Sequence, residues 1–558
     1  MKINEYFGNY KENNLNQLIS YMEKLDNKLD KYYNFGKPFF KGEYKLKYGE
    51  FLEQKNLNKN SLTSEDVFNY IAPYFKNIPN WNNPGTMINV IPPVNLISLA
   101  VSNIASMYNP NFAQDTYAGM LITSEMEVSK YLSNLVGWNW KHTHGVFTFG
   151  GKGTNLYATK IAINKADPNV KNNGCERNKY FMLTSKNGHP CHYEVCNWLG
   201  IGISNCYEIE CDKNGQMDIN QAREIIEKNI ENGKTFLGFN LTAGSTNELY
   251  VDPIKKVYDL NKEIILKYKL NYVPHIHADA VLGWVYLFFN TYDFRKNPLL
   301  IEKDNLKKIK SLNKKVKELK YADSIGVDFH KTGFCPYTSS IVLFKNKEDY
   351  FTLDSKDNIP IEELEYGNYN PYHTTLELTR SSNGPLTSLC TLKSLGIEGF
   401  QKIISKMFST TEYFRKKIAQ DKRICLINPE TEGLASLFII KPAKYITLSL
   451  DEILKLPPEE ITEIRNYNVN YGKYILEQSK NGYISFTYTS SRSYIVPGTN
   501  VKIGALKAYP MSVFLNYEEI DRILKEIDTS INTYSQIDNK KFDNKISISD
   551  NMVYREKK

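Results

Sequence analysis

The most reactive side chain that the sequence offers is a lysine that follows a strand-like segment. Residues 321–335 read YADSIGVDFHKTGFC, and every second residue over 325–329 is apolar, as in a strand with one buried face. Lys331 follows directly, next to His330. Burial lowers the pKa of a lysine, and a neutral amine attacks a carbonyl carbon to form a Schiff base. The pattern therefore predicts a Schiff-base lysine, with a solvated lysine after an edge strand as the alternative.

A second strand-like segment ends in a carboxylate. Residues 275–284 read HIHADAVLGW and contain Asp279. A Schiff-base lysine together with a carboxylate for a pyridinium nitrogen is the minimal apparatus of pyridoxal phosphate (PLP) chemistry. This segment also matches the HxHxD ligand pattern of metal-dependent hydrolases, through His275, His277 and Asp279. Nothing else supplies a second ligand set, so we expect no metal and keep the hydrolase as a remote alternative.

A glycine-rich segment offers a place for a phosphate. Residues 145–158 read GVFTFGGKGTNLYA, which predicts the end of a strand, a sharp turn and a helix over residues 154–165. Backbone N–H groups at a helix N-terminus, together with the helix dipole, favour an anion. The segment is not a Walker motif, because the GK[ST] ending is absent.

The elements around these segments alternate between strands and helices. This alternation predicts an α/β fold with a mainly parallel sheet and helices on both faces. Ligands of such sheets bind beyond the carboxyl ends of the strands, where the glycine segment, residues 242–246, Asp279 and Lys331 all fall. The predicted strands cover residues 180–185, 235–241, 272–278 and 323–329, and the predicted helices cover residues 192–199, 252–267 and 386–407.

Length and composition limit the class of protein. The chain has 558 residues, of which 41% are hydrophobic and 24% are charged, and its formal net charge is +8. Acids and bases are interspersed, so we expect no nucleic-acid partner. No apolar run reaches transmembrane length and the first residues lack the apolar core of a signal peptide, so we expect no membrane association. Eight cysteines without a CxxC pair favour reduced thiols in a cytoplasm.

We expect four regions along the chain. Residues 1–83 form an N-terminal helical segment, residues 84–422 a large domain, residues 423–535 a smaller α+β domain, and residues 536–558 a disordered tail. Residues 354–372 are rich in glycine, proline, asparagine and tyrosine, which predicts a long loop near the site that could act as a lid.

Over residues 84–531 the sequence resembles the group II PLP-dependent amino-acid decarboxylases. Their TELE, GGSxANL, HYS, TAGTT, HVDAAYGG and DSxxxDxHK motifs have counterparts in the same order. These counterparts are residues 124–127, 150–156, 192–193, 242–246, 277–283 and 323–331. Three residues depart from the family pattern. Lys152 replaces a serine or threonine, Val281 an alanine and Trp284 a glycine, and these departures concern the shape of the pocket and not the cofactor.

The resemblance implies a PLP-dependent aminotransferase-like (type I) fold and a role for each matching residue. Lys331 would hold PLP as a Schiff base, Asp279 would pair with the pyridinium nitrogen, and His192 would stack on the ring and orient the substrate carboxylate. The remaining residues that the resemblance assigns to the cofactor are Gly151, Lys152, Gly153, Thr154, Thr242, Ser324 and His330. Lys152 would either add a charge for the phosphate or point to solvent.

The resemblance also implies a reaction and an assembly. The reaction would be decarboxylation of an L-amino acid to an amine and CO2, in a homodimer with the active site at the subunit interface. A loop tyrosine would donate a proton to the substrate carbon, and the candidates are Tyr366, Tyr369 and Tyr372. Arg380 would bind a carboxylate or, as we favour, close a structural salt bridge. Another PLP-dependent lyase or aldehyde-forming reaction, and a catalytically idle PLP-binding scaffold, remain as alternatives.

Overall fold

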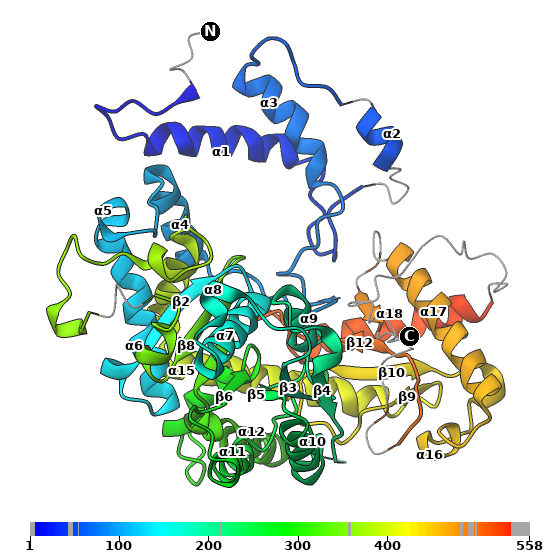
Figure 1. The fold of residues 1–558 in the computed structure, drawn as a ribbon. Coiled ribbons are helices and arrows are strands. Elements are labelled where there is room, and N and C mark those ends of the chain that lie inside the picture. Colours follow the sequence, from blue (N-terminus) through cyan, green and yellow to red (C-terminus); the bar gives the residue numbers. More distant parts are fainter. Residues whose placement is uncertain are drawn as a thin grey trace.

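A seven-stranded sheet forms the centre of the protein (Figure 1). The computed structural model describes residues 6–42, 48–53, 55–212, 214–354, 359–478, 482, 484–488, 496 and 499–536. The order of the strands across the sheet is β2 (His144–Thr148), β8 (Ser340–Phe344), β7 (Ser324–Asp328), β6 (His275–Asp279), β5 (Thr235–Thr242), β3 (Tyr180–Ser185) and β4 (Cys206–Ile209).

The sheet is mainly parallel, as the sequence predicted. All neighbouring strands from β7 to β4 pair in parallel, and β8 alone runs against its two neighbours, β2 and β7. The strand predicted from residue 272 begins only at His275. Pro274 precedes it and has no N–H group to donate to the ladder, which explains the later start.

Helices cover both faces of this sheet. In Figure 1, α7 and α9 lie on one side of it, and α10, α11 and α12 lie on the other. On the side of α10, α11 and α12, apolar side chains of the strands and helices form one large buried cluster, and on the side of α7 and α9 they form two smaller ones. The helices are α6 (Thr123–Val136), α7 (Gly151–Ala166), α9 (Cys191–Trp198), α10 (Ile219–Glu231), α11 (Ile254–Tyr268), α12 (Lys303–Val316) and α15 (Asn383–Ile418).

Helix α7 begins three residues earlier than predicted. Its first residue is Gly151, and the N–H of Gly153 donates to the carbonyl of Gly150 at 2.8 Å. A Cβ on Gly153 would lie 2.4 Å from Oγ1 of Thr148, so only glycine lets this first turn pack against the end of β2. The prediction failed because glycine is read as a helix breaker, whereas here close packing requires it.

A second sheet is formed mostly by the C-terminal part of the chain. Its order is β1 (Thr86–Met87), β11 (Ser485–Tyr488), β12 (Leu506–Ala508), β10 (Ser436–Ile440) and β9 (Ile424–Leu426). Helices α16 (Leu450–Ile453), α17 (Pro458–Gln478) and α18 (Tyr517–Ser535) accompany it. Strand β1 pairs in parallel with β11, so a segment that the sequence assigned to the large domain contributes to this sheet.

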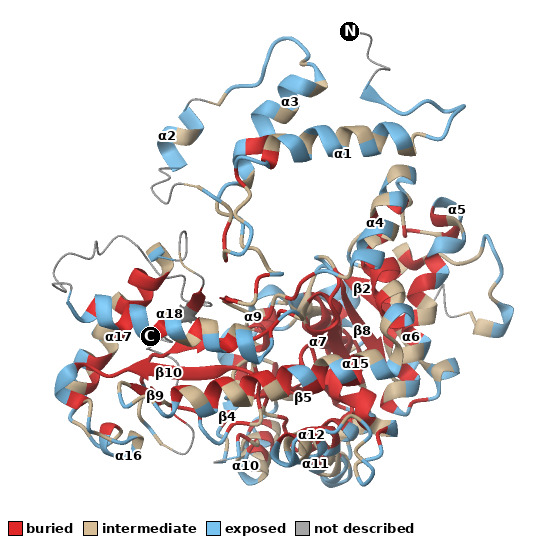
Figure 2. Ribbon diagram, turned by 180° about the vertical axis from the view of Figure 1, so that it is seen from behind, coloured by how far each residue is buried: buried red, intermediate tan, exposed pale blue. Residues whose placement is uncertain are grey.

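The N-terminal helices lie apart from both sheets. Figure 2 shows that buried residues concentrate in the sheets and the helices on them, whereas α1 (Leu15–Leu29), α2 (Tyr48–Glu53) and α3 (Ser64–Ile71) are mostly exposed. Among the described residues, no helix combines the length and the apolar character needed to cross a membrane. The tail predicted to be disordered lies, from residue 537 on, outside the described residues. The other α-helices are α4 (Leu96–Tyr108), α5 (Asp115–Ala118), α8 (Val170–Asn173), α13 (Phe329–Thr332) and α14 (Lys347–Tyr350).

Candidate active site

Lys331 lies directly beyond the carboxyl end of β7, in the single helical turn α13. Its Nζ is 2.7 Å from Oδ2 of Asp328, the last residue of β7. The Lys331 side chain is 27% exposed, so it remains reachable, whereas Asp328 is buried. The amine is thus held at the sheet edge where the sequence placed it.

The protonation of Lys331 differs from the prediction. Burial disfavours the ammonium form, but the neighbouring carboxylates, Asp328 first and Asp279 after it, outweigh burial and raise the pKa of Lys331. The sequence led us to expect a pKa lowered by burial. That expectation was wrong because Asp328 was read only as part of a strand, whereas its carboxylate turns back onto the lysine three residues later.

Asp279 ends the neighbouring strand β6 and is buried. Its Oδ2 accepts a hydrogen bond from Nδ2 of Asn155 at 3.2 Å and lies 3.0 Å from Nε2 of His192. Burial alone would raise the pKa of Asp279, but the hydrogen bond with His192 and the charge of Lys331 lower it below its ordinary range. Asp279 is therefore a carboxylate at neutral pH.

His192 is fixed from both sides of its ring. Its Nδ1 lies 2.8 Å from Oγ1 of Thr184, and its Nε2 contacts Asp279. The predicted stacking of His192 on a cofactor ring stays a prediction. Within the described part of the chain, His192, Asp279 and Cys191 also hold potential ligand atoms within 4.8 Å of one another. These three groups belong to the site that contains Lys331.

The HxHxD run does not gather into a metal site. Nε2 of His275 and Nδ1 of His277 both point at the hydroxyl of Ser324, at 2.7 and 2.8 Å. Burial lowers the pKa of His277 to about 3. The same contacts correct the assignment of Ser324 to the phosphate. Ser324 begins β7, roughly 13 Å of strand before Asp328, and so lies at the opposite end from Lys331.

The glycine turn lies against the lysine. A Cβ on Gly151 would lie 3.0 Å from Oδ2 of Asp328, which places the N-terminus of α7 next to the Lys331–Asp328 pair. Thr154 is buried in this first turn and its hydroxyl donates to the carbonyl of Gly151 at 2.7 Å. The N-terminus of a helix attracts a phosphate because its first N–H groups have no helical partner.

Two further residues that were predicted to contact the cofactor lie at the carboxyl ends of the strands. His330 precedes Lys331, with Nε2 3.6 Å from Oδ2 of Asp328. Thr242 ends β5 in register with Asp279, and its buried hydroxyl makes no hydrogen bond within the described structure. The structure thus brings Thr242 and His330 to the same strand ends as Asp279 and Lys331.

The departures from the family pattern have distinct surroundings. Lys152 pairs with Glu194, and both side chains are more than 40% exposed, so Lys152 points to solvent. Val281 is buried beside Gly151. The ring of Trp284 is fully buried and lies 4.7 Å from the ring of Phe329, so it fills the core behind the lysine turn.

The structure does not bring the three loop tyrosines into the group formed by Lys331 and Asp279. Tyr369 packs against Phe112, Ala118 and Ile122, and its N–H donates to Oδ2 of Asp115. The N–H of Tyr372 donates to the carbonyl of Ala113. Tyr366 is exposed. Part of the predicted loop, residues 355–358, lies outside the described residues.

Arg380 closes a buried salt bridge. Its Nη1 and Nη2 lie 2.6 and 3.1 Å from the two carboxylate oxygens of Glu125, and both residues are buried. Oε1 of Glu125 also accepts the N–H of Phe147 in β2. This two-pronged geometry gives Arg380 the structural role that we favoured from the sequence.

We expect Glu125→Gln to destabilise the protein by about 3–5 kcal/mol, because it leaves the buried Arg380 charge without a counter-charge. A lower midpoint of urea unfolding measures the loss. Glu127→Gln is the matched control on the same helix. Its ion pair with Lys393 is partly exposed, so we expect a change of about 1 kcal/mol or less. Equal midpoints for the two variants would contradict the structural role of Glu125.

Sequence reasoning missed three residues that position the site. Asp328 holds Lys331, Asn155 donates to Asp279, and Thr184 contacts His192. Asn155 follows Gly151 by four residues, a helical spacing that places both on one face of α7. That spacing was a usable signal. The contact of Thr184 with His192 joins β3 to α9 and has no signature in the sequence.

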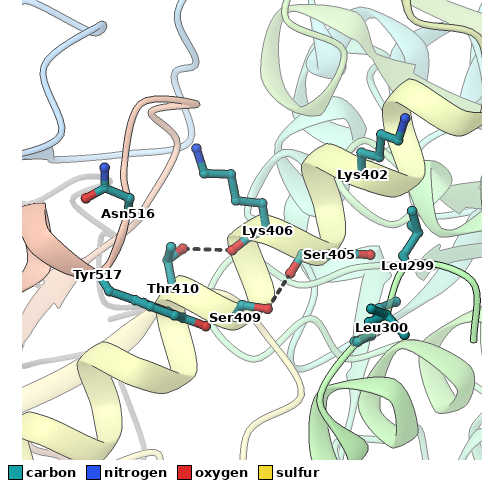
Figure 3. Close-up of a pocket in the computed structure, with 10 residues that line it drawn as sticks. Leu299, Leu300, Lys402, Ser405, Lys406, Ser409, Thr410, Asn516 and Tyr517 are labelled. Atoms are coloured by element: carbon teal, nitrogen blue, oxygen red, sulfur yellow. Dashed lines mark hydrogen bonds between the residues drawn. The ribbon is translucent and has the colours of Figure 1, made fainter.

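A cavity of about 350 Å³ lies elsewhere, between α15, the start of α18 and residues 299–301. In Figure 3, Lys402 and Lys406 rise from α15, Asn516 lies across from Lys406, and the ring of Tyr517 extends toward Ser409. Lys406 donates to the carbonyl of Val513 at 2.6 Å and Lys402 pairs with Glu398. These cations are already paired, and the cavity is separate from Lys331.

The geometry agrees with what comparison with known proteins finds. The family described as the pyridoxal-dependent decarboxylase conserved domain matches residues 50–441, more than half of the chain. The chain belongs to this family. An L-aspartate decarboxylase, dtxS4, of Metarhizium robertsii is 25% identical over 265 residues. The match covers 48% of this chain and 47% of that protein, so the chain matches about half the length of this curated relative.

Two solved structures share the fold of this decarboxylase family member. Mouse CSAD in its apo form has a TM-score of 0.73 at 18% identity, and the match covers 92% of this chain and 99% of that one. Oryza sativa TDC, solved with PLP and tryptamine, has a TM-score of 0.73 at 14% identity, with coverage of 95% and 100%. The type I fold expected from the sequence is therefore confirmed.

The residues present fit the PLP cofactor of the family. An amine and a carboxylate end adjacent strands, a glycine turn opens a helix beside them, and the buried hydroxyl of Thr242 is left for a bound group to satisfy. The cofactor predicted from the sequence is confirmed by the family.

Proposed function

We propose that this protein is a PLP-dependent decarboxylase that converts an L-amino acid to the corresponding amine and CO2. The observation that carries the proposal is that Lys331, Asp279 and His192 converge at the carboxyl ends of adjacent strands. Asp279 ends β6 and Lys331 follows the end of the paired strand β7, so the carboxylate and the amine lie at the same edge of the sheet. Membership of the family adds independent support.

Each residue would act on the cofactor or the substrate through a group already in place. Lys331 would form the covalent link to PLP, and the N-terminus of α7 would bind the phosphate. Asp279 would keep the ring nitrogen protonated, which its lowered pKa supports. When bound, PLP supplies an electron sink for the pair of electrons left when the bond to the substrate carboxylate breaks. His192, tied to Thr184, would orient that carboxylate.

Which bond of the substrate breaks depends on where the protein holds the substrate carboxylate. The bond that breaks is the one held perpendicular to the cofactor ring, and the residues that grip the carboxylate select it. Because Arg380 is already paired with Glu125, we do not assign the substrate carboxylate to Arg380. His192 stays the residue that we assign to it, and its ring would have to give up its contact with Thr184 or Asp279 to bind the carboxylate.

A panel of the common L-amino acids, assayed for CO2 and for the organic product, tests the proposal. We expect CO2 with one amino acid or one narrow chemical group of them, together with an equal amount of amine. An aldehyde in place of the amine would point to the aldehyde-forming alternative. No CO2 across the panel from protein that carries PLP would overturn the proposal in favour of an idle scaffold.

We propose further that the protein works as a homodimer with the site at the subunit interface. The support is an unpartnered apolar face beside the site. The first residues of α4 include Leu96 and Ile97, which are exposed, and the N–H of Asn95 donates to the carbonyl of Phe334, three residues after Lys331. Such a face favours association. A loop tyrosine of the partner would then serve as the proton donor.

The compartment that we propose is the cytoplasm. All eight cysteines are present as thiols, as expected for a reducing environment. Five of them are buried, so they pack as small apolar side chains.

A further inference from the structure

Asp328 is held in the place where it controls the charge of the cofactor lysine. Its Oδ2 lies 2.7 Å from Nζ of Lys331, and its other oxygen, Oδ1, accepts the hydroxyl of Ser340 in the antiparallel strand β8. The Asp328 side chain is 1% exposed, so this carboxylate is shielded from bulk solvent and attracts the ammonium more strongly than a solvated carboxylate would. Because Asp328 is fixed in this way, the Lys331 side chain has to move away from it to break the ion pair.

Building on the proposed role of Lys331, we propose that Asp328 is a positioning residue that clamps Lys331 as an ammonium in the cofactor-free protein and so sets the pH above which PLP can be attached. In this geometry, the ion pair of Lys331 with Asp328 competes with the reaction of the Lys331 amine with PLP. A carbonyl carbon reacts only with the neutral amine. The amine must therefore leave Asp328 and lose a proton to solvent before it reacts.

The attachment step balances as follows. The neutral amine of Lys331 adds to the aldehyde carbon of PLP, a C=N bond forms, and the aldehyde oxygen leaves as water with two protons from the nitrogen. No oxidant or reductant takes part. Asp328 acts before this step, because the ammonium that it stabilises has no free electron pair to attack with.

Other charged and titratable groups also face Lys331, and they do not form this contact. Asp279 acts on it from the end of β6 as a second negative charge. Burial and, after it, the charge of Lys331 lower the pKa of His189 to about 4, so His189 is neutral at pH 7. The remaining groups are His330 in α13, Cys191 in α9 and Tyr337 in the loop after α13. Asp328 is the group that both touches the amine and, next to burial, has the largest effect on its pKa, which it raises.

The test measures the charge state of Lys331 without any catalysis. The full-length protein is stripped of PLP with hydroxylamine, labelled briefly with acetic anhydride over a series of pH values, and digested for mass spectrometry. In the wild type, we expect the labelling midpoint of Lys331 to lie above that of the exposed lysines. In Asp328→Asn we expect it to move down, so that labelling of Lys331 at a fixed pH below the midpoint rises about tenfold for each unit of pKa lost.

Glu194→Gln is the matched control, because it removes a rim carboxylate that pairs with Lys152 and not with Lys331. We expect its Lys331 profile to follow the wild type. A profile of Asp328→Asn that overlays the wild type, or an equal shift in Glu194→Gln, would overturn the proposal. If Asp328→Asn does not fold, the wild type decides alone, since a Lys331 midpoint at or below that of the exposed lysines overturns it as well.

A second readout follows the attachment itself. PLP is added in excess to the stripped protein, and the rate at which the yellow absorption appears is recorded against pH. In Asp328→Asn we expect the rise of this rate to begin at lower pH than in the wild type. Neither readout requires an amino-acid substrate, so a failed decarboxylation assay and a failed clamp are separate results.

Discussion

Lys331→Ala is expected to lose the covalent link to PLP and essentially all turnover. Borohydride reduction of the wild type followed by digestion should yield a PLP-modified peptide containing Lys331, and the variant should yield none. Without the lysine the cofactor binds only through non-covalent contacts and the substrate has no link to displace. We expect kcat/KM to fall by at least about a thousandfold, equivalent to roughly 4 kcal/mol of transition-state stabilisation.

The experiment on Lys331→Ala has to distinguish a loss of catalytic activity from a loss of stability. Removing Lys331 leaves the buried Asp328 without its counter-charge, which by itself costs stability. The double variant Lys331→Ala with Asp328→Asn removes both charges and should recover the thermal midpoint of the wild type without recovering activity. Lys152→Ala serves as the lysine control and should keep the link, because its side chain points to solvent. A reducible link that survives in Lys331→Ala would show that another lysine carries the cofactor.

Asp279→Asn is expected to keep part of its PLP and to lose most of its turnover. An amide matches the carboxylate in size but has no negative charge, so it no longer favours the protonated ring nitrogen that the electron sink requires. We expect kcat to fall by about a hundredfold to a thousandfold, or about 3–4 kcal/mol, while the reducible link to Lys331 remains.

The pH dependence gives this variant a second check. The folded-state pKa of Asp279 is depressed, so its charge is present from well below neutrality upward and is lost only as the pH falls through that low value. The acid limb of the wild-type profile above about pH 5 should therefore come from other groups. Asn155→Ser, which removes one donor to Asp279 and keeps the carboxylate, should cost only about tenfold. Unchanged turnover in Asp279→Asn would refute the pairing with the ring.

The elements that could be predicted from the sequence are those with a strong periodic pattern. Strand β3 agrees with its prediction at both ends, and α9 and α11 begin and end within about two residues of the expected positions. Asp279 and Lys331 could be placed together because parallel strands end at one edge of a sheet, and that topology follows from the alternation of elements. Thr242 and His330 were placed at this edge of the sheet for the same reason.

The errors arose where tertiary contacts outweigh local pattern. Ser324 was assigned to the phosphate through its motif, but its position at the start of β7 places it with His275 and His277. The pKa of Lys331 was predicted to fall because burial was visible in the sequence and Asp328 was not recognised as its partner. Whether one of the loop tyrosines donates a proton stays a prediction, because the structure does not bring Tyr366, Tyr369 or Tyr372 to Lys331 within one chain.

The pairing of β1 with β11 has a consequence for how the polypeptide reaches its final state. Thr86 and Met87 are synthesised almost 400 residues before Ser485 and Phe486, with which they align. The smaller sheet cannot be completed until β12, which ends at Ala508, has left the ribosome, and pairing of segments so far apart in the chain is intrinsically slow. A shortened polypeptide beginning after Pro92 would leave β11 with an open edge, a surface that invites pairing between chains and aggregation. The boundary of an independently expressible piece therefore has to lie before β1.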